Sequence, residues 1–150
     1  MKSSTGADVL PQGNFHHIGF VVASIQTCVQ EFVDSLQAEW DGVIFYDPNQ
    51  GVRVTFLRGK RPANPTLELV EPASENSPVI PFLKRGGGLH HLCYEVTSLE
   101  DQLALSRAQG ALLVKPPLPA VAFEGRRIAW VYTRNKLLLE YLERPGPVAE

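Results

Sequence analysis

The stretch HHIGFVVASIQ (residues 16–26) decides the fold, because its pattern returns as HHLCYEVTSLE at residues 90–100. The second stretch begins 74 residues after the first, and the apolar positions keep the same order. Two further pairs follow in step: GVRVTFL (51–57) matches GRRIAWV (125–131), and TLELVEP (66–72) resembles LLLEYLERP (137–145). Three matched blocks in the same order indicate a duplicated module.

Each copy is expected to form a strand, a helix and then further strands. Residues 15–22 alternate as a strand does, Ser24 is a candidate N-cap, and a helical apolar face follows. That face comprises Ile25, Cys28, Val29, Phe32 and Leu36. The second copy repeats the order, with a strand over 91–96, Ser98 as N-cap with Asp101 at the capping-box position, and Gly110 as the helix stop. Later strands are predicted at 53–58, 67–71, 127–133 and 137–142.

The predicted organisation is one α+β domain spanning residues 1–150. Module one covers about 14–72, and module two covers about 88–144. Between them, residues 76–86 predict a short connecting helix with Pro78 as its first residue, closed by the glycines at 86–88. Residues 1–13 and 145–150 are expected to be loose tails.

Alternation along the strands predicts which polar side chains converge. His17 and His91 lie on the strand faces that point away from the helices, and Glu68 and Glu140 occupy matched positions in later strands. A curved sheet built from both modules would then line its cleft with these four residues. A histidine in a strand is often an ordinary polar residue with its hydrogen bonds satisfied. Here, however, one histidine and one glutamate occur at matched positions in each copy. Two imidazoles and two carboxylates suit a divalent ion such as Co, Ni, Mn, Fe or Zn.

Other polar residues carry weaker signals. Strict alternation puts His16 and His90 on the opposite face, as structural or rim residues, whereas Cys93 and Glu95 share the face of His91. Cys93 is interpreted as a packing residue and Glu95 as a solvated charge at the strand end. Gln50 is interpreted as a turn residue, and Trp40 and Trp130 as core or interface. Four basic residues are either phosphate ligands or scattered surface charge: Lys84, Arg85, Arg126 and Arg127.

Composition excludes several classes of function. The chain has 14 basic and 16 acidic residues, a formal charge of −2 and a pI near 6.1. This balance gives no sign of a nucleic-acid-binding or membrane-binding surface. The opening residues lack the apolar core of a secretory signal, and only two cysteines occur. We therefore expect a cytoplasmic protein without a disulfide framework.

At these residues the chain resembles the vicinal oxygen chelate (glyoxalase/bleomycin resistance/dioxygenase) superfamily. The likeness covers about residues 15–144 and is greatest to the methylmalonyl-CoA epimerase family. It rests on HHIGFVV, on NQGVRVTFL and above all on LELVEPASENSPVIPFLKRGGGLHHLCYEV (67–96). The resemblance implies two βαβββ modules that form a half-open curved sheet around a metal-binding cleft. By motif position, the metal ligands implied are His17, Glu68, His91 and Glu140.

The chain departs from the epimerase pattern at two positions of the implied site. Some epimerases carry glutamine at the position of Glu68, so this ligand set resembles that of the glyoxalases. A glutamate proposed as the second acid/base in some epimerases is replaced here by Val54. The resemblance therefore leaves Glu140 as the expected base and Glu68 as the candidate that returns the proton.

The function implied by the resemblance is a metal-dependent epimerase or isomerase that abstracts the α-proton of a 2-substituted acyl thioester. The acyl group, its carrier and the metal stay open, and we expect a homodimer. One alternative is a glyoxalase-type lyase acting on a thiol hemithioacetal, which the same four ligands would serve. Another is a non-catalytic small-molecule binding module of the same fold, although such modules need no metal ligands.

Overall fold

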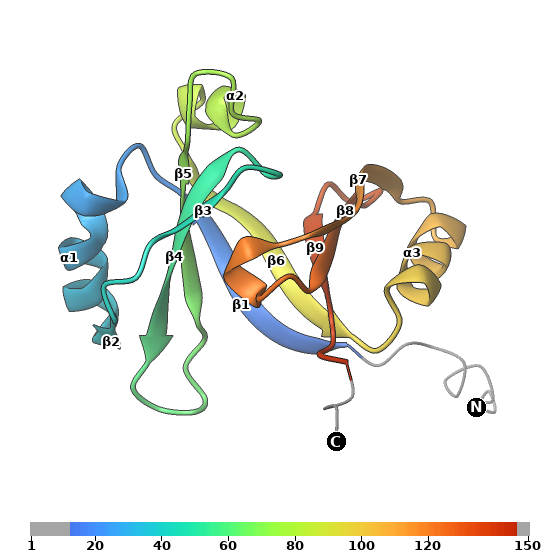
Figure 1. Ribbon diagram of the computed structural model, residues 1–150, viewed down its shortest axis with the longest axis horizontal. Helices are drawn as coiled ribbons and strands as arrows, with labels where there is room; N and C mark the ends of the chain where they lie inside the picture. Colours follow the sequence, from blue (N-terminus) through green and yellow to red (C-terminus); the bar gives the residue numbers. More distant parts are fainter. Residues whose placement is uncertain (1–12, 147–150) are drawn as a thin grey trace.

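A computed structural model of the protein describes residues 13–146 (Figure 1). The first half of the chain forms β1 (Asn14–Val21), α1 (Ile25–Leu36), β2 (Ala38–Glu39), β3 (Phe45–Asp47), β4 (Val52–Gly59) and β5 (Leu67–Pro72). A short helix, α2 (Ile80–Lys84), leads to the second half. That half forms β6 (Gly88–Val96), α3 (Leu99–Ala108), β7 (Leu112–Pro119), the 3-10 turn η2 (Val121–Phe123), β8 (Arg127–Tyr132) and β9 (Leu138–Glu143). The predicted α+β class is confirmed.

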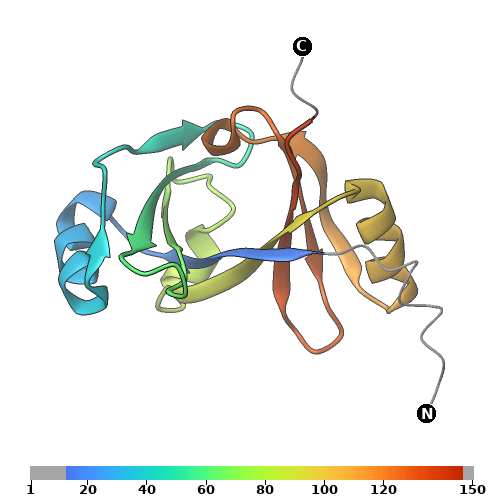
Figure 2. The ribbon, with the colours of Figure 1, turned by 90° about the horizontal axis from the view of Figure 1, so that it is seen from below.

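The two halves share one sheet and are related by an approximate two-fold axis. Strands β1 and β6 pair antiparallel at its centre, β5 runs parallel to β1, and β9 runs parallel to β6. The order across the sheet is β2-β4-β5-β1-β6-β9-β8-β7, and β3 pairs with β4 beside this path. Figures 1 and 2 show α1 and α3 at opposite ends of the molecule, each outside its own half of the sheet.

Helix α1 packs its apolar face on the sheet. Ile25 and Val29 are buried with Val22, Leu57 and Leu69 in one core cluster. Burial of such side chains contributes about 1.5–3 kcal/mol each. Cys28 and Phe32 are partly buried against this cluster, as predicted. The prediction for Leu36 is wrong, because this last residue of the helix is 49% exposed, and Val33 packs on the cluster instead.

The helix caps differ between the two halves. Ser98 acts as predicted, since its Oγ accepts a hydrogen bond from the backbone N–H of Asp101 at 3.2 Å. Ser24 occupies the N-cap position of α1 with extended backbone, but its side chain makes no cap hydrogen bond. The backbone N–H of Ile25 instead donates to Glu71 Oε1 at 3.0 Å. A carboxylate on β5 thus satisfies the helix terminus and ties it to the sheet.

The connecting helix is shorter than predicted. It begins at Ile80 rather than Pro78, and the proline in its first turn is Pro81. The helix is closed by the three glycines, as predicted, because Gly86, Gly87 and Gly88 all have positive φ (120°, 67° and 102°). Gly87 also approaches Val21 so closely that a Cβ would lie 2.8 Å from the carbonyl oxygen.

Both ends of the sheet carry strands that discourage further pairing. Strand β7 was not predicted, because Pro116, Pro117 and Pro119 lack the N–H that a ladder needs. It is tolerated at the edge, where β8 is its only partner along the sheet path. At the other end β2 has only two residues. Most of the predicted tails, 1–13 and 145–150, lie outside the described residues.

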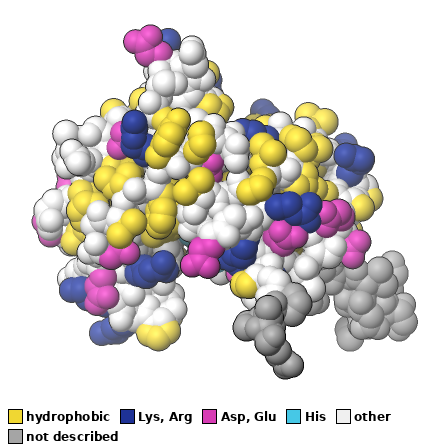
Figure 3. Space-filling model, in the orientation of Figure 1, with side chains coloured by type: hydrophobic (Ala, Val, Ile, Leu, Met, Phe, Trp, Pro, Cys, Tyr) yellow, Lys and Arg dark blue, Asp and Glu magenta, His cyan; other side chains and the backbone are white. Residues whose placement is uncertain are grey.

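Charges of both signs are interspersed on the face seen in Figure 3, without a large patch of one sign. This agrees with the near-neutral composition. Among the described residues, no helix combines the length and apolar character needed to span a membrane.

Two leucines on helices give a matched test of the packing. Leu99 is fully buried at the start of α3, whereas Leu36 is largely exposed at the end of α1. We expect Leu99→Ala to lower the free energy of unfolding by about 2–5 kcal/mol and Leu36→Ala to change it by less than about 0.5 kcal/mol. Urea denaturation checks both, and equal losses would contradict the assignment of the α1 face.

Candidate metal centre

The structure brings the four predicted side chains into one buried group, here called the His/Glu cluster: His17, Glu68, His91 and Glu140. The Nε2 atoms of His17 and His91 lie 3.2 Å apart. His17 Nε2 is 3.4 Å from Glu68 Oε1 and 3.1 Å from Glu140 Oε1. His91 Nε2 is 3.3 Å and 3.5 Å from the same two oxygens. Each module thus contributes one imidazole and one carboxylate.

Register explains this convergence. On β1, Gly19 is paired with His91 of β6 and also with Glu68 of β5. On β6, Cys93 is paired in the same way with His17 of β1 and Glu140 of β9. A small residue therefore lies between His91 and Glu68, and another between His17 and Glu140. At Gly19 the need is strict, because a Cβ would lie only 1.9–2.4 Å from atoms of the His91 ring.

The spacing of the cluster fits a divalent ion. Nitrogen and oxygen ligands at about 2.0–2.1 Å from a central ion are about 2.8–3.4 Å from one another, depending on tetrahedral or octahedral arrangement. The imidazole and carboxylate atoms lie 3.1–3.5 Å apart. Glu140 Oε1 is buried, and its polar neighbours include the two imidazoles of the cluster. These observations make the cluster a suitable site for a divalent ion held by two nitrogens and two oxygens.

Electrostatics in the cluster favour charged forms despite burial. Burial lowers the pKa of His17, but Glu68 and Glu140 outweigh it and raise the pKa to about 10. The pKa of His91 is also raised by the same carboxylates against the effect of burial. Conversely, burial favours protonation of Glu68 and Glu140, and the two histidines reverse this and lower both pKa values. Without a metal, the group therefore holds protons between its histidines and carboxylates at neutral pH.

The prediction that His16 and His90 point to the opposite face is wrong. The β1–β6 register shifts at both positions: His16 is an extra residue between the pairs Phe15–Tyr94 and His17–Cys93, and His90 is an extra residue on β6. Such β-bulges interrupt alternation and redirect side chains. His16 Nδ1 lies 2.8 Å from His17 Nδ1, and His90 Nδ1 lies 2.8 Å from His91 Nδ1. Burial, with the neighbouring histidine, lowers the pKa of His16, and it lowers that of His90 to about 4.

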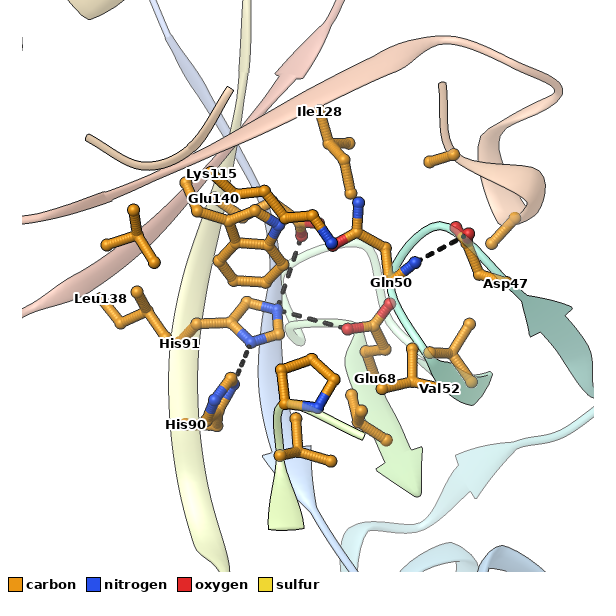
Figure 4. Close-up of a pocket in the computed structure, with 18 of the residues that line it drawn as sticks. Asp47, Gln50, Val52, Glu68, His90, His91, Lys115, Ile128, Leu138 and Glu140 are labelled. Carbon is orange, nitrogen blue, oxygen red and sulfur yellow. Dashed lines mark hydrogen bonds and ion pairs between the residues drawn. The ribbon is translucent and has the colours of Figure 1, made fainter. Parts of the chain in front are cut away.

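A cavity of about 280 Å³ opens above the cluster (Figure 4). Its walls are largely apolar and come from both modules; they include Val52, Val54, Val70, Val79, Ile128 and Leu138. Glu68, His91 and Glu140 face into it, together with His90. The arrangement gives an apolar chamber with the charged cluster as its floor.

Two buried N–H donors in this cavity have no hydrogen-bond partner among residues 13–146: Gln50 Nε2 and Trp130 Nε1. Figure 4 shows the Gln50 side chain directed into the cavity, on the side of Glu140 and Glu68. The sequence interpretation of Gln50 as only a turn residue missed this orientation, as did that of Trp130 as core. In the repeat, Trp130 is aligned with Phe56, which has no polar atom in its side chain. The alignment therefore could not indicate a polar role for Trp130.

The turn that carries Gln50 is tied to the second module. Asp47 Oδ1 accepts hydrogen bonds from the backbone N–H groups of Asn49 and Gln50, and its Oδ2 accepts one from Val121 in η2. Asn49 Nδ2 donates to the carbonyl of Pro119, and Lys115 Nζ donates to the carbonyl of Asn49. These contacts join the 47–51 turn to β7 and η2 at the cavity, and they fix the backbone from which Gln50 projects.

The remaining candidate residues on β6, Cys93 and Glu95, make structural contacts. Cys93 is fully buried beside Phe123 and Leu142, and burial raises the pKa of its thiol well above the usual range. It is a packing residue, as expected. Glu95 is not a lone solvated charge, since it forms an ion pair with Arg126 at 2.9 Å.

The four basic residues divide into two pairs. Arg127 forms ion pairs with Glu100 and Glu143, both at 2.7 Å, and Arg126 is engaged by Glu95. Lys84 and Arg85 are exposed at the end of α2. Structural ion pairs therefore account for the two arginines at the start of β8, Arg126 and Arg127.

Gly19 offers a direct test of the geometry. We expect Gly19→Ala to displace the His91 ring and to weaken binding of Co²⁺ by at least about tenfold, because a ligand loses its position. The control is Gly13→Ala, where a Cβ meets nothing closer than 3.6 Å. Calorimetric titration of both metal-free variants measures the affinities. Equal affinities would show that His91 does not need this space to bind the ion.

Known proteins share this architecture. Residues 16–130 match the family described as the Glyoxalase/Bleomycin resistance protein/Dioxygenase superfamily. The chain is 26% identical over 125 residues to ethylmalonyl-CoA/methylmalonyl-CoA epimerase of Cereibacter sphaeroides, covering 82% of this chain and 90% of that protein. It is 32% identical over 137 residues to the uncharacterized protein YqjC of Bacillus subtilis, covering 87% and 91%.

Solved structures agree. Methylmalonyl-CoA epimerase from Mycobacterium tuberculosis superposes with a TM-score of 0.75 at 26% identity, covering 98% of this chain and 94% of that one. A hypothetical protein from Bacillus halodurans gives 0.76 at 29% identity, covering 93% and 99%. The duplicated sheet, the cluster at its centre and these matches lead to one assignment: this chain belongs to the glyoxalase/bleomycin resistance protein/dioxygenase superfamily.

Proposed function

We propose that this protein is a metal-dependent epimerase or isomerase that abstracts the α-proton of a 2-substituted acyl thioester. The observation that carries the proposal is the His/Glu cluster, whose Glu68, His91 and Glu140 line the floor of a largely apolar cavity while His17 is buried directly behind them. Relatives named as methylmalonyl-CoA epimerases support the reaction class. A solved relative of the same fold is an epimerase in complex with methylmalonyl-CoA, which supports an acyl thioester as the ligand class.

His17, Glu68, His91 and Glu140 would hold the divalent ion. Once bound, such an ion supplies Lewis-acid stabilisation of negative charge on the carbonyl oxygen of the substrate, worth several kcal/mol. The α-proton of a thioester is too weakly acidic for a carboxylate alone. The protein residues then have two tasks, which are to move the proton and to position the substrate.

Glu140 is the proposed base. Its carboxylate is ionised at neutral pH, as a base must be, because His17 and His91 lower its pKa against the effect of burial. Its carboxylate faces a cavity whose walls are largely apolar. A positioned general base contributes about 10²–10⁴-fold to a rate.

Glu68 is the proposed group that returns the proton. It occupies the equivalent position in module one and also faces the cavity. Val54, where some epimerases carry a second acid/base, lies in the apolar wall with Val52 and Val70. With valine at this position, two carboxylates of module one line the cavity, and Asp47 is held by backbone N–H groups of the 47–51 turn and of η2, which leaves Glu68. A return of the proton on the other face of the carbon would complete epimerisation.

Gln50 and Trp130 are proposed to hold the substrate. Their unpartnered N–H groups require acceptors, because a buried donor without a partner costs about 1–3 kcal/mol. Oxygen atoms of a carboxylate or thioester carbonyl fit this need. The valine-lined wall suits the alkyl substituent of the α-carbon.

Metal binding is expected to release protons. The carboxylates raise the pKa of His17 to about 10, so an ion that binds through His17 Nε2 at pH 7 must displace a proton. The affinity for Co²⁺ should therefore increase as pH rises from about 6 to 9. Calorimetry in buffers of different ionisation enthalpy measures the release as at least one proton per ion. A heat that is independent of the buffer would contradict binding at His17.

The reaction is tested by deuterium exchange. With Co²⁺ bound, the protein in D₂O should introduce deuterium at the α-carbon of methylmalonyl-CoA. Glu140→Gln should lower this rate by about 10²–10⁴-fold while keeping an oxygen ligand, and metal content is measured alongside. The exposed Glu75, outside the cavity, supplies the matched control Glu75→Gln, which should exchange at the wild-type rate.

Two outcomes would overturn the proposal. Absence of exchange with every acyl-CoA tested, together with conversion of a thiol hemithioacetal, would identify a glyoxalase-type lyase. Binding of a ligand without turnover of either substrate class would identify a binding module. Exchange without inversion would retain proton abstraction by Glu140 and reject the role of Glu68.

A further inference from the structure

We propose that His16 and His90 are positioning residues, which accept the Nδ1–H of His17 and His91 and so direct the Nε2 lone pairs of those rings to the centre of the His/Glu cluster. The inference rests on the metal site proposed above. It assigns a role to the first histidine of each doublet, which strand alternation had placed on the wrong face.

The same contact is built twice. The Nδ1–Nδ1 distance is 2.8 Å in each doublet, although the two doublets lie on different strands. Each contact depends on a β-bulge in the β1–β6 ladder, at His16 on one strand and at His90 on the other. In regular strands, adjacent side chains point to opposite faces and could not meet. Two bulges at equivalent positions therefore produce one local geometry in both modules.

The positions of the protons follow from the opposite ring nitrogens. Nε2 of His17 and Nε2 of His91 face the two carboxylates. If Nε2 binds an ion, the neutral ring carries its proton on Nδ1; if the ring is protonated, both nitrogens carry one. In either state Nδ1 of His17 or His91 is a donor. Two donors cannot share a 2.8 Å contact, so Nδ1 of His16 and of His90 is the acceptor and their own proton sits on Nε2.

Packing holds the accepting rings in place. The His16 ring meets Phe123 edge to face, with centroids 5.4 Å apart. The His90 ring meets Phe82 in the same manner at 4.9 Å and also contacts Trp130 at 6.2 Å. A ring locked by aromatic neighbours presents its Nδ1 in one direction, as precise metal sites require.

A neutral acceptor suits the charge of this centre. Metal-bound histidines commonly donate their second N–H to a carboxylate, a backbone carbonyl or water. The cluster already contains two buried carboxylates, Glu68 and Glu140. A further carboxylate behind each histidine would add negative charge where little solvent can compensate it. Imidazole supplies the acceptor without that charge.

The test separates hydrogen bonding from packing. His16→Phe and His90→Phe keep an aromatic ring but remove the acceptor, and each should weaken Zn²⁺ binding by about 10–100-fold in calorimetry. His90→Gln restores an acceptor oxygen and should recover most of the lost affinity. Leu89→Ala is the matched control, because this neighbour of His90 on β6 is 70% exposed and takes no part in the doublet contacts; its affinity should stay within about threefold of wild type.

A second measurement uses the unmodified protein. Nitrogen-15 NMR of histidine-labelled, Zn²⁺-loaded protein should show His17 and His91 protonated on Nδ1, and His16 and His90 protonated on Nε2. This readout needs no variant to fold. Protonation of His16 or His90 on Nδ1 would overturn the inference.

Failure of the inference is distinct from failure of the proposed metal site. If the wild type does not bind Zn²⁺ or Co²⁺, the metal site itself is rejected, and with it this inference. If the wild type binds and both phenylalanine variants bind within about threefold of it, the metal site stands and the positioning role is rejected.

Discussion

The antiparallel pairing of β1 with β6 is the interaction on which the rest of the structure depends. It joins the two modules at the approximate two-fold axis and sets His17 opposite Cys93 and Gly19 opposite His91. Parallel neighbours on each side then bring Glu68 and Glu140 to the same place. A slip of one residue would turn every side chain of β1 to the other face. The cluster would then be lost and the core against α1 would be exposed.

Four buried titratable groups at this centre are compatible with folding only because they compensate one another. An isolated buried charge costs several kcal/mol, and the opposite pKa shifts of the histidines and the carboxylates show that each partner stabilises the charged form of the other. Removing one member would leave an unpaired charge. The arrangement therefore favours a complete set of four residues, whether the centre holds protons or an ion.

The sequence predicted the duplicated modules, the main strands and helices and the members of the cluster, because repetition and alternation report on local geometry. It did not predict β7, since three prolines argue against a strand unless an edge position is known in advance. It also misplaced His16 and His90, because a bulge depends on the partner strand. The prediction for Leu36 is wrong because Val33, not Leu36, is the apolar side chain of the last turn that packs on the core cluster. A homodimer, a cytoplasmic location and the module boundaries stay predictions.

The two blunt ends of the sheet have a consequence for assembly. A strand rich in proline at one end and a two-residue strand at the other offer few free backbone groups for a neighbouring chain. Extension of the sheet from molecule to molecule is therefore discouraged at both ends. The prolines of β7 and the shortness of β2 therefore work against a growing ribbon of paired sheets and favour association through side chains of a helix or a sheet face.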